Sequence, residues 1–163
     1  MIFVTVGSAE KGMEFERLVR EMDRIAGVLG VDVLIQRGTV DYEPRHARHV
    51  RFVRFDKALD LFRQADLVVG HCGAGTTMNA VRFRKPLILV PRRAARGEHS
   101  DDHQMELAAL FGQVRGIRIV EDIRRLEETI REMLARPDER PEPTERRRGL
   151  TQAVSEFLGH PWS

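Results

Sequence analysis

The sequence predicts an α/β fold in which strands and helices alternate around a mostly parallel sheet. The first observation is a set of six short apolar runs, most of them rich in valine, isoleucine and leucine. Consecutive apolar β-branched residues are typical of strands that are buried on both faces of a parallel sheet. The second observation is that helical patterns separate these runs, which implies right-handed crossovers with helices on both faces. Together they predict a Rossmann-like three-layer sandwich.

The predicted strands follow the apolar runs in order. They comprise residues 2–6, 31–35, 50–53, 67–70, 87–90 and 117–120. Predicted helices are marked by apolar side chains spaced three and four residues apart, which gives a helix one buried face. These stripes lie at residues 13–25, 58–65, 107–111 and 123–134. A further helix is expected directly after the glycine-rich turn at residues 73–77.

The chain has 163 residues, which is enough for one domain with a full core. We expect this domain to span residues 1–136. Beyond it prolines recur and apolar side chains vanish, so residues 137–145 are expected to form a linker. Residues 146–163 are expected to form a last short helix and a tail, which either packs back on the domain or docks on a partner.

The composition predicts a soluble globular protein, with 32% charged and 42% hydrophobic residues. No apolar run approaches the roughly 20 residues of a membrane helix, and no signal peptide is expected. The single cysteine, Cys72, excludes an internal disulfide and fits a reducing cytoplasm. The net charge of +2 argues against a nucleic-acid partner, although clustered arginines could meet phosphates or an anionic membrane face.

Glycine follows two of the predicted strands, at Gly7-Ser8 and at Arg37-Gly38. Glycine permits a tight turn whose backbone amides can face an anion, and an arginine can pair with a phosphate. Each signal is weak by itself. The alternatives are an ordinary strand-to-helix turn at Gly7-Ser8 and a surface arginine at Arg37.

A stronger signal is the run His71-Cys72-Gly73-Ala74-Gly75-Thr76-Thr77, which follows a predicted strand and opens a helix. The first turn of a helix offers free N–H donors and a positive dipole end, and Gly73 and Gly75 permit close approach, so a diphosphate is the natural ligand. Asn79 lies one turn further along and could reach a ribose. The run matches neither the P-loop nor the G-x-G-x-x-G fingerprint. The alternative is a well-capped buried helix.

A polar loop follows the strand at residues 87–90. It contains Arg92-Arg93, Glu98-His99 and Asp102-His103-Gln104, groups that could converge on a sugar and its phosphates. A zinc site is an alternative, but no H-E-x-x-H motif or third soft ligand is nearby. Helix capping is another, but it explains only the serine and the aspartates of this loop. For Cys72, a small buried hydrophobic residue is a simpler interpretation than a nucleophile.

Three of these stretches resemble the donor-binding half of the GT-B glycosyltransferases of family 28. They are residues 65–76, 85–90 and 102–108. The same half occurs in the transferase that forms peptidoglycan lipid II and in the catalytic subunit of the dolichol-pathway UDP-N-acetylglucosamine transferase. Narrower motifs lie at residues 3–7, 90–93, 97–99 and 120–123. With them the chain is most similar to the small subunits of bacterial capsule and exopolysaccharide glycosyltransferases, over roughly its first 135 residues.

The resemblance implies a UDP-sugar donor and a polyprenyl-diphosphate-linked acceptor. It assigns the diphosphate to residues 7–8 and 73–77 and the border of the uracil to Phe55 and its neighbours. It assigns hydroxyl groups of the ribose and the sugar to Asn79 and the loop at residues 102–104. No metal or other cofactor is expected, because such sites can draw their positive potential from the protein itself.

Two positions depart from the family pattern. Asn79 stands where the larger family often has a glutamate at the ribose contact. Met105 stands where relatives often have a second glutamine. Asparagine can bond the ribose only as a neutral group. Met105 argues against specificity for N-acetylglucosamine and leaves galactose, glucose and glucuronate open.

The favoured hypothesis is a subunit of an inverting glycosyltransferase, in which an acceptor hydroxyl attacks the anomeric carbon while UDP leaves. Helix N–H groups and Arg92 or Arg93 would stabilise the leaving diphosphate. Glu98 and His99 are candidate catalytic bases, although GT-B bases more often lie in the other half of the enzyme. We therefore expect a membrane-associated partner subunit, and a cytoplasmic protein recruited to the inner face of the membrane.

Two other functions fit the same motifs. One is a non-catalytic nucleotide-sugar binding module that regulates a separate transferase. The other is an unrelated nucleotide-binding fold such as a sugar epimerase. The missing G-x-G-x-x-G motif and the missing Tyr-x-x-x-Lys pair argue against the epimerase, since Tyr42, the single tyrosine, is followed by His46.

Overall fold

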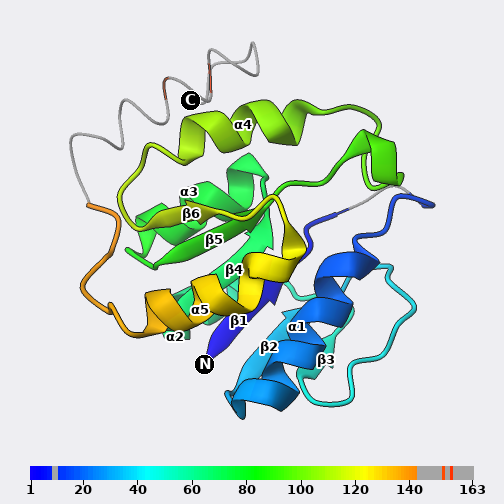
Figure 1. The fold of residues 1–163 in the computed structure, drawn as a ribbon, viewed down its shortest axis with the longest axis horizontal. Helices are drawn as coiled ribbons and strands as arrows, with labels where there is room; N and C mark the ends of the chain where they lie inside the picture. The colour runs from blue at the N-terminus through cyan, green and yellow to red at the C-terminus, as the bar shows by residue number, and fades with distance from the viewer. Residues whose placement is uncertain (9–10, 143–151, 153–154, 156–163) are drawn as a thin grey trace.

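The described part of the chain forms a six-stranded sheet in which neighbouring strands run parallel. The computed structural model describes residues 1–8 and 11–142, together with Gln152 and Ser155. Its strands are β1 (Ile2–Thr5), β2 (Val33–Gln36), β3 (Arg48–Val50), β4 (Leu67–His71), β5 (Leu87–Val90) and β6 (Ile117–Ile119). Its helices are α1 (Glu16–Leu29), α2 (Phe55–Gln64), α3 (Ala74–Arg82), α4 (His103–Phe111) and α5 (Leu126–Leu134), with 3-10 turns η1 (Ala94–Arg96) and η2 (Ile123–Arg125). The predicted α/β class is confirmed (Figure 1).

The strand order β3-β2-β1-β4-β5-β6 means that the sheet grows outward from β1 in one direction and from β4 in the other. β1 and β4 are neighbours, and Thr5 lies opposite Gly70 near their carboxyl ends. The chain leaves β1 for α1 on one face and leaves β4 for α3 on the other, so the connections diverge between these strands (Figure 1). Ligands of open α/β sheets bind at such a switch point.

Helices cover both faces of the sheet, as the predicted three-layer sandwich requires (Figure 1). α1 and α5 pack on one face, over side chains such as Val4 and Val69. α2, α3 and α4 pack on the other face, over side chains such as Phe3 and Val68. Because successive side chains of a strand point to opposite faces, Thr5 lies on the same face as Phe3, below α2 and α3.

The third strand differs from its prediction. The apolar run at residues 50–53 predicts a strand there, whereas β3 ends at Val50 and the rest of the run is a loop. β3 is an edge strand whose residues are exposed or half-buried, and Phe52 is 66% exposed. The prediction was wrong because it assumed that these apolar side chains are buried on both faces. The other five predicted strands agree with the structure within two residues.

The described residues after α5 run back along the start of β6. Glu139 pairs with Arg118 at 2.9 Å, and a Cβ atom added at Gly116 would lie 2.8 Å from Pro141. The predicted helix and tail at residues 146–163 fall outside the described residues, apart from Gln152 and Ser155. Within the described ranges, no helix combines the length and the apolar character that crossing a membrane requires.

Candidate functional site

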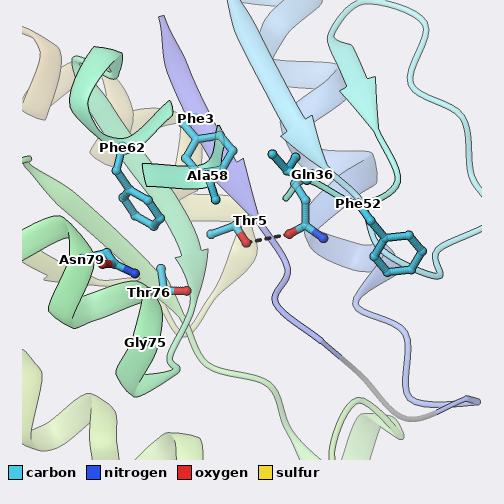
Figure 2. Close-up of a pocket in the computed structure, with 10 residues that line it drawn as sticks. Phe3, Thr5, Gln36, Phe52, Ala58, Phe62, Gly75, Thr76 and Asn79 are labelled. Carbon is cyan, nitrogen blue, oxygen red and sulfur yellow. Dashed lines mark hydrogen bonds between the residues drawn. The ribbon is translucent and has the colours of Figure 1, made fainter. Parts of the chain in front are cut away.

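A cavity of about 240 Å³ opens at the carboxyl edge of the sheet, on the face covered by α2 and α3 (Figure 2). It is lined by Phe3, Thr5, Gln36, Phe52, Val53, Ala58, Phe62, Gly75, Thr76 and Asn79. Aromatic and aliphatic groups form part of the lining, and polar groups from β1, β2 and α3 form the rest. Such a lining fits a small molecule with a flat apolar part and polar substituents.

Thr5 and Gln36 form the polar floor of this cavity. They are register partners on β1 and β2, and the Thr5 hydroxyl donates to Oε1 of Gln36 at 2.7 Å (Figure 2). Nε2 of Gln36 donates to the Arg51 carbonyl at 3.1 Å, and the Thr5 hydroxyl oxygen accepts from the Gly7 backbone N–H at 3.2 Å. The network fixes the orientation of the Gln36 amide and ties the floor to the loops on both sides.

The predicted glycine turn forms another wall. Gly73 is the N-cap of α3, and no side chain within the described residues caps this helix, so its first N–H groups are left for a ligand. A Cβ atom added at Gly75 would meet nothing within 4 Å, so this residue borders open space. Thr77 faces inward, since its hydroxyl donates to the Gly73 carbonyl at 3.0 Å. Thr76 and Asn79 line the cavity beside the turn.

The His71 imidazole lies between Gly7 and Gly73. A Cβ atom at either glycine would overlap this ring, so a larger residue at either position has to displace it, and Gly7 also has a φ of +69°, which favours glycine. Burial, together with the charge of Arg92, lowers the pKa of His71 to about 3, so the ring is neutral. Its Nδ1 atom is buried and has no hydrogen-bond partner within the described part of the chain. Buried polar atoms are normally paired, so this atom is an exception within the described residues.

Gly70 sets how closely α3 approaches the sheet. A Cβ atom added there would lie 2.9 Å from the methyl carbon of Thr76 and 3.2 Å from the Thr5 carbonyl oxygen. Both separations are shorter than ordinary contacts of a Cβ atom. The absence of a side chain at Gly70 therefore fixes the spacing between β1 and the first turn of α3.

Arg92 lies beneath the turn that follows β1, where it is 2% exposed. Its guanidinium donates to the carbonyl oxygens of Val6 and Ser8 and lies over the ring of Phe15. Burial lowers the pKa of Arg92, and the nearby Glu98 opposes this effect. Arg92 therefore places a buried positive charge next to the turn after β1.

The two candidate catalytic bases have different surroundings. Glu98 is 5% exposed, and its carboxylate oxygens accept from Nε and Nη2 of Arg17 at 2.8 and 2.9 Å. This carboxylate is neutralised within the protein. His99 is 31% exposed and contacts Asp101 at 3.0 Å. Only the imidazole has direct access to solvent and to an incoming group.

The predicted sugar-binding triplet is divided between two roles. Oε1 of Gln104 is buried and accepts from the backbone N–H groups of Cys72 and Arg92 at 3.1 and 3.0 Å. It thereby joins the ends of β4 and β5. Asp102 accepts a hydrogen bond from the loop backbone at 3.2 Å, and the His103 side chain is 60% exposed. Gln104 supports the site through the backbone.

Among the predicted site residues, Gly75, Thr76 and Asn79 line the cavity and the others do not. Arg37, Gly38 and Arg93 are three of those that do not. Arg37 lies on the opposite face of the sheet, where its buried guanidinium pairs with Glu43 at 3.0 Å. Gly38 has a φ of +58° and shapes the turn after β2. The Arg93 side chain is partly exposed and pairs with Glu121 at 3.2 Å. The structure does not bring either of these arginines to the cavity.

Sequence reasoning missed part of the cavity lining. Thr5 and Gln36 are polar residues at the ends of two apolar strands, and the alternation of side chains along strands could have placed them on one face. Phe52 and Val53 fall in the run predicted as a strand, which hid their position on the cavity wall. Phe55, expected to border the uracil, begins α2 close by and is 72% exposed.

The surroundings of Cys72 favour the simpler of its two interpretations. The residue is fully buried, and burial raises the pKa of its thiol to about 12. At neutral pH it is a thiol, whereas a nucleophile must be a thiolate. Across the described ranges, no three His, Cys, Asp or Glu side chains are grouped so that they could hold a metal ion.

The sequence matches a known family over nearly its whole length. Residues 1–157 match the glycosyltransferase family 28 C-terminal domain. A curated relative is 38% identical over 112 residues: the UDP-N-acetylglucosamine–N-acetylmuramyl-(pentapeptide) pyrophosphoryl-undecaprenol N-acetylglucosamine transferase of Opitutus terrae. The match covers 63% of this chain and 28% of the relative, so the chain spans under a third of that protein.

Solved structures share the fold at low sequence identity. The glycotransferase of kitacinnamycin has a TM-score of 0.64 and 18% identity, over 96% of this chain and 39% of that one. The UDP-GlcNAc 2-epimerase of Methanocaldococcus jannaschii has a TM-score of 0.57 and 14% identity, over 97% and 45% of the two chains. The fold alone does not choose between transferase and epimerase, but the family match does. This chain belongs to the glycosyltransferase family 28 C-terminal domain family, and its resemblance to the donor-binding half of GT-B enzymes is confirmed.

Proposed function

We propose that this chain binds a UDP-sugar and forms the donor side of an inverting glycosyltransferase. The observation that carries the proposal is that a cavity with aromatic walls adjoins a helix N-terminus that no side chain of the described residues caps. A flat base fits the cavity, and a diphosphate fits the helix N-terminus. The relative from Opitutus terrae supports the same donor class, since its name specifies a UDP-linked sugar.

The uridine would occupy the cavity above Thr5 and Gln36. Phe52 offers an exposed ring at one wall, which can stack on a pyrimidine (Figure 2). Asn79 at another wall offers donors and an acceptor for the ribose hydroxyls. The Gln36 amide already has protein partners, so its contribution is to shape the floor.

The diphosphate would lie over Gly75 and beside the His71 ring. The first N–H groups of α3 point toward this position, and the helix dipole makes it positive. The buried charge of Arg92 adds to that potential from behind the turn. These fixed groups would stabilise the negative charge that builds on the leaving UDP. We therefore propose that this step uses no metal or other cofactor.

The acceptor hydroxyl must lose a proton as it attacks the anomeric carbon. Glu98 is held by Arg17, which makes His99 the better candidate within this loop. We propose that a membrane-associated partner subunit completes the acceptor side and presents a lipid-diphosphate-linked glycan at the inner face of the membrane. This proposal rests on the resemblance of the chain to the small subunits of split bacterial glycosyltransferases. Its motifs favour capsule or exopolysaccharide synthesis as the setting.

Titration calorimetry with UDP tests the donor assignment. The wild-type chain should bind UDP, and Gly75→Asp should weaken binding at least about tenfold because a carboxylate enters the diphosphate position. The variant should fold, since the position borders open space and an acidic residue suits the first turn of a helix. Gly75→Asn has the same size without the charge and should lose less affinity. Equal affinities of wild type and Gly75→Asp would contradict the proposed site.

A transfer assay separates the enzyme from a binding module. The purified chain would be added to membranes from its source strain deleted for its gene, together with radiolabelled UDP-sugars. Transfer of label to lipid that depends on the added chain, and that is lost in a His99→Ala variant which still binds UDP, supports the enzyme. UDP binding with label transfer that does not depend on the chain would instead support the non-catalytic module.

A further inference from the structure

Two arginines connect the end of β5 with the region from β1 to α1: Arg92 is buried, and the Arg17 side chain is 15% exposed. Arg92, after β5, donates to the carbonyl oxygens of Val6 and Ser8 after β1. Arg17, the second residue of α1, donates through Nη2 to the Pro91 carbonyl after β5 at 3.3 Å. Arg92 therefore holds the backbone after β1, and Arg17 holds the backbone after β5, next to Arg92.

Both guanidinium groups contact the ring of Phe15, which is fully buried. The Cζ atoms of Arg17 and Arg92 lie 5.2 and 5.4 Å from the ring centroid. Cation–π contacts of this length are favourable, and more so away from water. Two positive charges on one buried ring nevertheless require a counter-charge.

Glu98 provides that counter-charge. Its Oε1 accepts from Nε of Arg17 at 2.8 Å and its Oε2 from Nη2 at 2.9 Å, a bidentate pair. The same Oε2 accepts from the Arg93 backbone N–H at 3.1 Å. The side chains of Arg17 and Glu98 are 15% and 7% exposed, so removing one partner leaves the other as a buried charge.

We propose that Arg17 and Glu98 are positioning residues of the diphosphate subsite, and that Glu98 holds its loop instead of accepting the acceptor proton. The inference rests on the proposed function. Glu98 bonds Arg17 and the Arg93 backbone. These bonds fix the position of Arg92, which lies between Pro91 and Arg93 after the end of β5. Arg92 in turn fixes the carbonyl groups on either side of Gly7. Loss of the Arg17–Glu98 pair would let the turn after β1 and the Arg92 guanidinium move. The nucleoside cavity would keep its lining, because none of these side chains belongs to it.

The test compares two probes, UDP and uridine, in Arg17→Met and Glu98→Gln. Calorimetry measures the affinity for UDP, and an NMR titration measures the weaker affinity for uridine. Both variants should bind UDP about tenfold more weakly than wild type, with uridine affinity within about twofold. Residues with a role in stability alone would lower the melting temperature and leave the ratio of the two affinities unchanged. The control variant Arg20→Met removes an exposed ion pair with Glu16 on the same helix. It should bind UDP and uridine with the affinities of wild type.

The outcomes distinguish the two proposals. If wild type binds UDP and both variants fold and bind it equally well, the positioning role is wrong while the proposed function stands. If wild type binds neither probe, the proposed function fails and the inference fails with it. A Glu98→Gln variant that keeps UDP affinity but loses transfer would make Glu98 the catalytic base and overturn its positioning role. Should Arg17→Met not fold, Arg17→Lys keeps the charge without the bidentate geometry and should lose about threefold in UDP affinity.

Discussion

The hydroxyl of Thr5 donates a 2.7 Å hydrogen bond to the side-chain oxygen of Gln36, its register partner on the neighbouring strand. The contact lies where two apolar strands end, so the sheet changes there from hydrophobic core to binding surface. It also turns the Gln36 nitrogen toward the Arg51 carbonyl, at 3.1 Å. This pair of side chains thus connects the two strands to each other and to the loop that carries Phe52.

Gln36→Leu removes the acceptor of Thr5 and the donor to Arg51. The free energy of unfolding should fall by about 1 to 2 kcal/mol, because hydrogen-bonding groups lose their partners. UDP binding should weaken as well, since the loop that carries Phe52 loses its tie to the floor. Urea denaturation and calorimetry measure the two effects. Adding Thr5→Val should cost less than the sum of the single changes, and strict additivity would show that the pair is not coupled.

Gly73→Ala and Gly75→Ala should differ sharply although the glycines are two residues apart. The added methyl group overlaps the His71 ring at Gly73 but borders open space at Gly75. Gly73→Ala should therefore lose about 1 to 3 kcal/mol of stability through overpacking, and bind UDP poorly. Gly75→Ala should melt close to wild type. Equal melting temperatures for the two variants would show that the His71 ring can move aside.

His71 should make stability fall in mild acid. Its pKa is lowered to about 3 in the folded chain, whereas an unfolded histidine titrates near about 6.5. Below about pH 6.5 the unfolded chain therefore binds a proton that the folded chain does not, at a cost of about 1.4 kcal/mol per pH unit. His71→Asn should flatten the profile of urea-derived stability between about pH 6 and about pH 4.5. An NMR titration that shows protonation of this ring above about pH 6 would contradict the assignment.

Asp23 should contribute stability with the pH dependence of a strongly bonded carboxylate. Burial raises its pKa, but hydrogen bonds outweigh burial and the pKa is lowered. The donors are the backbone N–H groups of Arg45, His46 and Ala47 and the Tyr42 hydroxyl. The contribution is present above the unfolded value of about 3.9 and is lost as pH falls through the lower folded value. Asp23→Asn should cost about 2 kcal/mol at neutral pH, and chemical denaturation in strong acid should show a smaller difference from wild type.

Cys72 should resist thiol reagents in the native protein. It is fully buried with a pKa raised to about 12, so a thiolate is rare and inaccessible. Ellman's reagent at about pH 8 should label the chain slowly in buffer and rapidly in urea. Because the sequence has a single cysteine, the labelling rate reports opening of the structure around β4. Fast labelling without denaturant would contradict the burial of this residue.

The sheet could be predicted because burial on both faces constrains every residue of a central strand. Leu87–Val90 is apolar throughout, and its predicted bounds agree with β5. The constraint weakens at the edge of the sheet. β3 contains Arg48 and is exposed on alternate residues, so the apolar residues of the following loop gave a misleading pattern.

The site could be predicted only where its chemistry is local in sequence. The glycine turn at residues 73–77 combines strand end, glycine and helix start within a few positions. The partner of Glu98 is not local, because Arg17 lies 81 residues away in the chain. Nor can a sequence motif show that Gln104 uses its oxygen on backbone N–H groups.

Because Gly70 has no side chain, the first turn of α3 packs directly against the strands beneath it. A side chain at this position would push the first turn of α3 away from β1. The depth of the cavity would then change while every group that faces the ligand keeps its identity. Donor preference in such a protein can therefore drift, or be engineered, by a substitution made from behind the site.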